Sequence, residues 1–282
     1  MTMRRGITLV ELLIAILIAA IIGASLIAML VGQGKFSERL TGERAARGAA
    51  RGAQGILTSD LRMVDPDWGI EAASPTLLRV RVPYALGVFC GVDGTNYVVQ
   101  VLPVDQAQFD QAGHAGYAIR RAGGAYTAYP TSGRTAIGST SACTGASPSI
   151  TVVPNAIIVQ LPQPAAPPAV PYPGTPVLFY RRIEYSYGTS TVHGKRALFR
   201  TILADDGPVA TEVGGPFLDA AAFAFFTRGA PVTATSTTPS PLTELVGIQI
   251  GMPGCPERNP RIATQTVSTD LTTSVYFTNR RN

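Results

Sequence analysis

The sequence predicts an α+β fold in which a long amino-terminal helix packs against a β-rich globular head. Two observations predict this division. Residues 12–31 contain no charge, and residues 35–63 continue without proline. Beyond Trp68, short apolar or alternating runs are separated by turn residues, as expected of β-strands. The 29 Gly and 22 Pro among 282 residues fit a head with many turns.

The uncharged stretch has the length of a membrane span. Twenty residues in a helix cover about 30 Å, the thickness of a bilayer's hydrocarbon core, and we expect the transmembrane part at about 9–31. Arg4 and Arg5 precede the span, so the positive-inside rule predicts a cytoplasmic amino terminus and places everything after about Lys35 on the other side. A plain signal anchor fits the same hydropathy, and Ala24 and Ala28 leave a cleaved signal open.

Glu11 is the anomaly of this segment. A side-chain charge at the centre of a transmembrane helix costs about 2.5–3.5 kcal/mol on insertion scales. Glu11 stands one turn inside the apolar stretch. In a single molecule this carboxylate would stay near the cytoplasmic interface or take up a proton, so its position requires a partner or another reason.

The helix is predicted to continue through residues 35–63 and to end before Pro66. At 1.5 Å per residue, residues 7–63 would form one helix of about 85 Å. Apolar residues recur at helical spacing along one face: Phe36, Leu40, Ala49, Ala53, Ile56, Leu57 and Leu61. We expect Ile56, Leu57, Leu61 and Val64 to pack under the head.

The head, residues 64–282, contains seven runs with strand character. They are 77–84, 96–104, 156–162, 177–188, 195–203, 243–252 and 272–280. The fourth and fifth are expected to pair as a hairpin through 189–194. The order within 210–228 is ambiguous between a short helix and a buried strand. Residues 161–176 hold seven prolines and are predicted to form an extended surface loop, as a plain connection or as a docking site.

The start of the chain resembles a known processing signal. A short basic leader, Met1–Gly6, ends in glycine, and "ITLVE" runs from it directly into the span. This arrangement is similar to the class III signal of type IV prepilins and pseudopilins. The resemblance implies a pilin-like fold, cleavage between Gly6 and Ile7 by a prepilin peptidase, methylation of the new amine on Ile7, and a role for Glu11 in filament assembly. Ile7 departs from the family, which usually has Phe there.

The head resembles the J-type minor pseudopilins and W-type minor pilins, which have a "Y-R-[IVL]" strand, an "L-x-R" strand and a final strand ending in Arg-Asn. The matching stretches here are 176–188, 196–203, 217–226 and 269–282. The resemblance implies a minor structural subunit at the tip of a type II secretion pseudopilus or a type IV pilus. Its expected partners are other minor and major (pseudo)pilins, the prepilin peptidase and the inner-membrane assembly platform. It would be a single-pass inner-membrane protein with a periplasmic head. The alternative is a signal-anchored periplasmic binding or enzymatic domain that forms no filament.

Residues with other chemistry are few. Cys90 and Cys143 form one possible disulfide in an oxidising compartment, with Cys255 left over, and the spacing does not fix the connectivity. His114 and His193 are expected to be solvated loop residues. No catalytic or cofactor motif is found, so we expect neither an enzyme nor a bound cofactor. The net charge of +5 is scattered, so no nucleic-acid partner is expected.

Overall fold

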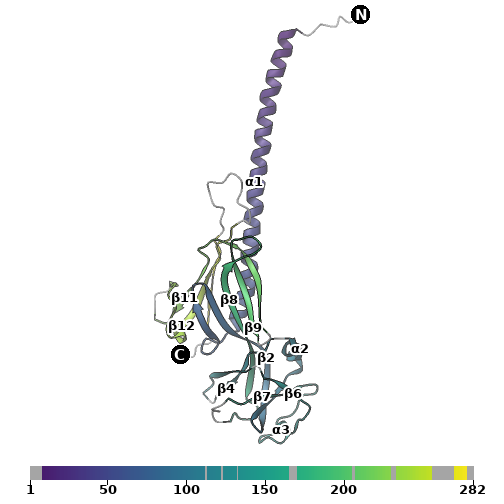
Figure 1. The fold of residues 1–282 in the computed structure, drawn as a ribbon, viewed down its shortest axis with the longest axis vertical. Helices are drawn as coiled ribbons and strands as arrows, with labels where there is room; N and C mark the ends of the chain where they lie inside the picture. Colours follow the sequence, from purple (N-terminus) through teal and green to yellow (C-terminus); the bar gives the residue numbers. More distant parts are fainter. Residues whose placement is uncertain are drawn as a thin grey trace, which may run out of the picture.

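The structure, a computed structural model, describes residues 8–111, 113–121, 123–131, 133–164, 170–204, 207–229, 233–255 and 270–277. It has the predicted architecture, a long helix followed by a β-rich head (Figure 1). The helices are α1 (Leu9–Met63), α2 (Gln106–Gln111) and α3 (Ser141–Thr144), with 3-10 turns at Pro103–Asp105 and Leu242–Glu244. The strands are β1 (Ile70–Ser74), β2 (Leu77–Asp93), β3 (Asn96–Val101), β4 (Gly116–Arg120), β5 (Tyr126–Pro130), β6 (Thr135–Ile137), β7 (Ile157–Pro162), β8 (Pro176–Thr189), β9 (Arg196–Ala204), β10 (Gly207–Phe217), β11 (Ala222–Thr227), β12 (Leu245–Gly251) and β13 (Thr272–Tyr276).

Helix α1 ends at Met63, three residues before the proline that predicted its end. Its carboxyl-terminal part packs on the head and buries residues at helical spacing: Ala46, Ala50, Ala53, Leu57, Asp60 and Leu61. The predicted face was wrong in part. Phe36 is 63% exposed and precedes Ala46, the first buried residue of α1. Ile56 is 42% exposed, because the face that meets the head passes through Ala50 rather than Ala49.

The larger sheet is antiparallel and runs β10-β9-β8-β2-β3-β7-β6 among the described strands, with β1 on β2, and with β4 between β8 and β5. The predicted hairpin of the fourth and fifth runs is confirmed, since β8 and β9 pair from Thr189 with Arg196 to Arg182 with Leu203. Strand β2 is longer than predicted. Pro83 lacks a backbone donor, but a bulge between Pro83 and Ala85 absorbs it and the strand continues to Asp93.

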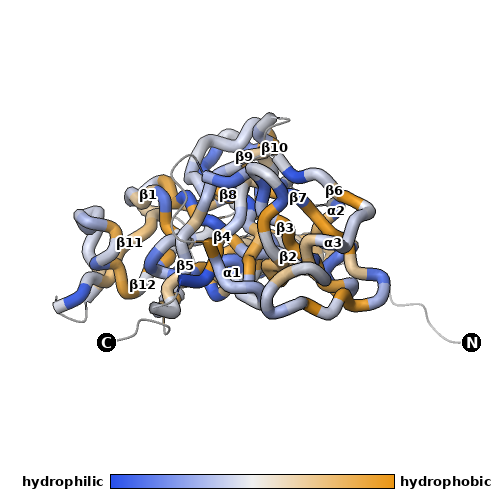
Figure 2. The backbone as a smooth tube through the Cα atoms, turned by 90° about the horizontal axis from the view of Figure 1, so that it is seen from below, coloured by the Kyte–Doolittle hydropathy of each residue, from blue (hydrophilic) through white to orange (hydrophobic). Residues whose placement is uncertain are grey.

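Because β2 and β8 are long, they join two lobes. In the proximal lobe β8 has β9 as a neighbour, and in the distal lobe, at Val177–Tyr180, it has β4 instead. The distal lobe is built on the far half of β2 with β3–β7, α2 and α3, and it lies at the end of the molecule opposite the amino terminus (Figure 1). Figure 2, seen from that end, shows the hydrophobic stretches of β2, β3 and β7 beside one another.

A second, three-stranded antiparallel sheet, β11-β12-β13, completes the proximal lobe. The ambiguous residues 210–228 belong to the end of β10 and to β11, so both segments are strands. The main core lies between α1, the larger sheet and this small sheet, and it includes Leu57, Val80, Ile183, Phe225 and Ile250. A separate core in the distal lobe is rich in aromatic residues.

The proline-rich segment connects β7 to β8. Residues 161 and 162 still belong to β7, and Pro176 begins β8, so the connection is shorter than the predicted 161–176. Residues 165–169 lie outside the described part of the chain.

Candidate assembly site at the amino-terminal helix

The first turn of α1 is closed by a reciprocal pair of side chains, Thr8 and Glu11. Thr8 is the N-cap, and its Oγ1 accepts a hydrogen bond from the Glu11 backbone N at 3.3 Å. Glu11 Oε2 in turn accepts from the Thr8 backbone N at 3.0 Å and from Thr8 Oγ1 at 3.1 Å. Glu11 therefore has a partner within its own chain.

This arrangement is a capping box, and the sequence pattern Thr-x-x-Glu at 8–11 could have revealed it. It satisfies backbone donors that a helix start leaves without partners, and it places a carboxylate at the positive end of the helix dipole. Besides a position near the lipid head groups and a contact with a neighbouring cation, the cap of its own helix is therefore a third possible role for Glu11.

The cap does not use the whole carboxylate. Both hydrogen bonds from Thr8 end on Oε2. Among the described residues, none donates a hydrogen bond to Oε1, and Glu11 is exposed on the helix surface. One oxygen thus remains for a donor from another molecule while the other caps the helix.

After the cap, α1 is apolar and exposed. Within the described chain, α1 is the one helix long and apolar enough to cross a membrane, and its most apolar part is not covered by the head. Leu9–Val31 presents large exposed apolar side chains along its length, with exposures of 50–78%. Such a surface requires lipid or other helices around it. Gly6 and Ile7, the predicted cleavage residues, lie outside the described residues.

A buried polar cluster fixes the far end of the same helix to the head. Asp60 on α1 is 6% exposed, and its Oδ2 accepts hydrogen bonds from the Tyr185 hydroxyl at 2.6 Å and from Arg200 Nε at 3.0 Å. Burial, followed by the Asp60 carboxylate, raises the pKa of Tyr185 well above its usual value, so the hydroxyl remains a donor. The cluster ties α1 to β8 and β9 at one point.

Close backbone packing supports the same contact. Gly214 on β10 lies so near α1 that a Cβ there would stand 2.5 Å from the Ala53 Cβ and 3.0 Å from the Ala49 carbonyl oxygen. A small residue is required on both sides, since any side chain on β10 would push the strand from the helix.

Both histidine predictions were wrong, because neither side chain is solvated. His114 is 7% exposed and makes a 3.1 Å hydrogen bond with the Tyr84 hydroxyl through Nδ1. Burial, helped by the Arg134 guanidinium, lowers the pKa of His114 to about 4. The His193 side chain is 8% exposed and contacts Glu212 at 3.1 Å.

His193 and Glu212 lie near Ser190, but the order of contacts is not that of a nucleophile and its base. The Ser190 hydroxyl donates to Glu212 at 2.6 Å rather than to the imidazole. His193 Nδ1 accepts the Lys195 backbone N–H at 3.2 Å, and Nε2 faces Glu212. The three side chains close the β8–β9 turn against β10. Among the described residues, no group of three His, Cys, Asp or Glu side chains could hold a metal ion.

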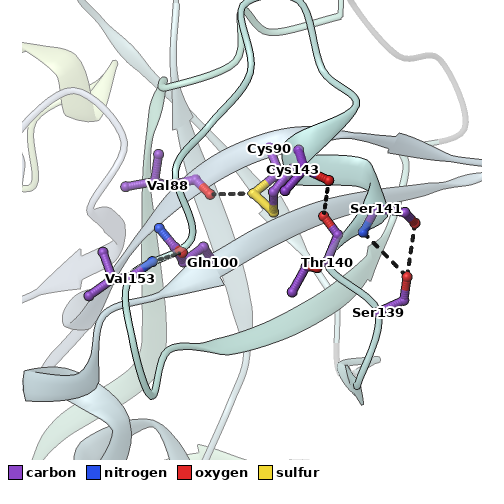
Figure 3. Close-up of a disulfide and its surroundings, with 9 residues drawn as sticks. Val88, Cys90, Gln100, Ser139, Thr140, Ser141, Cys143 and Val153 are labelled. Carbon is purple, nitrogen blue, oxygen red and sulfur yellow. Dashed lines mark hydrogen bonds between the residues drawn. A yellow bond between two sulfur atoms is a disulfide. The ribbon is translucent and has the colours of Figure 1, made fainter.

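The cysteines are paired in the distal lobe (Figure 3). Cys90 on β2 and Cys143 on α3 form a disulfide with an S–S distance of 2.06 Å, and both are fully buried. Beside it, the buried Gln100 accepts the Val153 backbone N–H at 2.8 Å, which holds the segment after α3 against β3. Cys255 is a buried free thiol.

Comparison with known proteins gives a match for the amino-terminal part of the chain. Residues 1–27 match the family model described as the prokaryotic N-terminal methylation motif. No curated protein and no solved structure matches the chain. The amino-terminal segment therefore carries the motif of a type IV prepilin-like precursor, joined to a helix that fits a single-pass membrane anchor.

Proposed function

We propose that the chain is a minor pilin or pseudopilin, a structural subunit rather than an enzyme. A prepilin peptidase would cut it after Gly6 and leave Ile7 with a methylated amine. It would lie in the inner membrane with a periplasmic head and then enter a type II secretion pseudopilus or a type IV pilus through the assembly platform. The observation that carries the proposal is Glu11, a carboxylate within the segment that matches the methylation motif, at the start of an exposed apolar helix.

The chemistry of Glu11 supports a partner in a neighbouring subunit. Its Oε2 caps the helix, and Oε1 has no donor among the described residues. A charge in an apolar medium is stabilised when an opposite charge meets it there. Cleavage creates a cationic amine four residues before Glu11, and staggered helices would bring the amine of one subunit to the carboxylate of another. The positive charge of the terminal amine and the negative charge of the carboxylate would then neutralise each other.

The head supports a minor subunit in the tip complex, with other minor and major (pseudo)pilins as partners. The "FYRRI" and "LFR" stretches that resemble J-type and W-type proteins lie on neighbouring strands, β8 and β9, and the first of them spans the point where β8 passes from the distal to the proximal lobe. The final Arg281–Asn282 lies outside the described residues. The size of the head, which includes a distal lobe with its own core, also favours a minor rather than a repeating major subunit.

Three variants test the role of Glu11, because they separate its charge from its cap. Glu11→Gln retains a side-chain oxygen for Thr8 but removes the charge, and Glu11→Val removes both. Thr8→Val breaks the cap but leaves the carboxylate. Each is expressed with the native assembly system, filaments are sheared from the cells, and the incorporated chain is measured by immunoblot.

We expect Glu11→Gln and Glu11→Val to lower incorporation by about tenfold or more, equivalent to about 1.4 kcal/mol of lost pairing. Thr8→Val should assemble nearly as the unaltered chain does. Normal assembly of Glu11→Gln together with failure of Thr8→Val would reduce Glu11 to a helix cap. A membrane-bound chain that never enters a filament would favour the alternative, a signal-anchored periplasmic domain.

A further inference from the structure

The distal lobe contains a cavity whose lining is cationic and aromatic. Its volume is about 700 Å³, within the range of ligand-binding pockets. Tyr97 comes from β3, Ile119 and Arg120 from β4, and Tyr129 from β5, while Arg121 follows β4 and Tyr172 precedes β8. The cavity therefore lies in the distal lobe. Figure 1 shows this lobe at the end of the molecule opposite the amino terminus.

The charged side chains that line this cavity are cationic. Arg120 and Arg121 line it, and no acidic residue is among the described residues that do. Within the described chain neither arginine forms an ion pair. Arg121 is held in place, since its Nε donates to Thr127 Oγ1 at 2.9 Å, its terminal nitrogen donates to the Tyr129 hydroxyl, and its guanidinium lies over the Tyr129 ring at 5.9 Å. A guanidinium that is held in place but has no ion-pair partner is suited to bind a carboxylate.

The hydroxyl of Tyr97 is a second, independent indication of a ligand. Tyr97 is 1% exposed, and its hydroxyl has no hydrogen-bond partner among the described residues. The ring packs edge-on against Phe89 and Tyr117, so the hydroxyl is fixed rather than free to turn to solvent. Burial and then Tyr129 raise the pKa of Tyr97 while Arg121 lowers it, and both of these neighbours line the cavity. Buried hydroxyls in proteins are nearly always paired, so this one requires an explanation.

The rim of the cavity is apolar and extended. Tyr172 is 80% exposed and Val170 is 58% exposed, and both belong to the connection before β8. On the other side, β5 pairs with β4 alone among the described strands, so one edge of β5 is open beside the cavity. An open strand edge next to side-chain pockets is a surface that binds an extended polypeptide.

From this geometry we propose that the cavity binds an extended acidic segment of a partner protein. The segment's carboxylate would accept hydrogen bonds from Arg120, Arg121 and the Tyr97 hydroxyl. An apolar side chain beside it would pack on Ile119 and Tyr172, and its backbone would follow the open edge of β5. The proposal concerns the distal lobe and does not depend on Glu11 or on filament assembly, so either can fail without the other.

The test uses the full chain in detergent micelles. The probe is a pool of fluorescein-labelled hexapeptides with Asp or Glu at three alternating positions and Leu, Phe or Tyr at the others, and binding is measured by fluorescence anisotropy. A second pool has Asn or Gln at the acidic positions. Arg120→Gln removes an exposed cavity charge, and the matched control, Arg228→Gln, removes an exposed charge at the end of β11.

We expect the acidic pool to bind saturably and the amide pool to bind about tenfold more weakly, a difference of about 1.4 kcal/mol. Arg120→Gln should weaken the acidic pool by a similar factor, and Arg228→Gln should leave it unchanged. Tyr97→Phe should weaken binding without lowering the melting temperature of the free chain, because the hydroxyl has no described partner there.

Several results would overturn the proposal. These are no binding by the acidic pool, equal binding of the two pools, or equal losses from Arg120→Gln and Arg228→Gln. Competition by inorganic phosphate as effective as that by unlabelled acidic peptide would identify a small-anion site instead of a protein-binding one.

Discussion

Replacing Asp60 by asparagine is expected to destabilise the head more than any other single charge removal on α1. The substitution keeps the volume of the side chain but leaves Arg200 buried without its counter-charge. Removing one partner of a buried ion pair costs about 3–5 kcal/mol. The Arg200 side chain is 18% exposed, and water there recovers part of the loss, so we expect about 2–4 kcal/mol.

The measurement is urea unfolding of the full chain in detergent micelles, followed by the fluorescence of Trp68, the single tryptophan, which is 7% exposed. Tyr185→Phe should cost about 1.5–3 kcal/mol, because it removes the hydrogen bond that the hydroxyl donates to Asp60 and the longer one that it accepts from Arg200 Nε. The matched control on the same helix is Glu43→Gln, whose partners Arg39 and Arg47 are exposed; we expect less than about 1 kcal/mol.

A loss below about 0.5 kcal/mol for Asp60→Asn, equal to that of the Glu43 control, would refute the reasoning. It would mean that the helix is held by its apolar face alone. The double variant Asp60→Leu with Arg200→Met gives a second check, since replacing both members of a buried pair is often neutral. It should recover most of the stability that Asp60→Asn loses.

Three further predictions concern other parts of the head. As the pH falls from 6.5 to about 4, His114 binds a proton in the unfolded chain but stays neutral in the folded one, so the free energy of unfolding should fall by up to about 3 kcal/mol. His114→Leu should remove this part of the pH dependence in urea titrations. An unchanged pH profile in the variant would contradict the prediction. Replacing Cys90 and Cys143 by serine opens a 53-residue link and should cost about 2–4 kcal/mol; equal melting temperatures for the oxidised and variant chains would argue against a stabilising bond. Gly214→Ala should cost about 1–3 kcal/mol through its clash with α1, and Ala53→Gly in the same chain should recover part of that; strictly additive losses would show that the two positions do not touch.

The long helix and the hairpin of β8 and β9 could be predicted because their signals are local. An uncharged run of membrane length and a proline just beyond the helix suffice for α1, and two alternating runs around a short turn suffice for the hairpin. The helix face was harder. Between Phe36 and Leu61 the apolar residues are mostly alanines, and alanine spacing does not distinguish Ala49 from Ala50.

The distal lobe could not be predicted, because it depends on pairings between distant segments. Pro83 indicated the end of a strand, yet a bulge lets β2 continue and supply a second sheet region. The burial of His114 likewise depends on β2 and β8, which bring Tyr84 and Phe179 to its ring. Neither partner is near His114 in the sequence.

At the candidate assembly site, the sequence supplied Glu11 but not its immediate partner. The capping box is a four-residue pattern, Thr-x-x-Glu at 8–11. A hydropathy argument misses it, because it considers Glu11 only as a charge within an apolar span. With the box in place, Glu11 has one local role and one oxygen left for assembly. The Asp60 cluster had no sequence indication, because its members are separated by 125 and 140 residues.

The most direct test of the central claim is the mass of the mature amino terminus. The full chain is expressed with and without a prepilin peptidase, purified from membranes and analysed by mass spectrometry of its amino-terminal peptide. We predict a peptide that begins at Ile7 with a methylated amine, and only when the peptidase is present. A terminus that remains at Met1 with the peptidase present, or one produced by cleavage near Ala28, would contradict it.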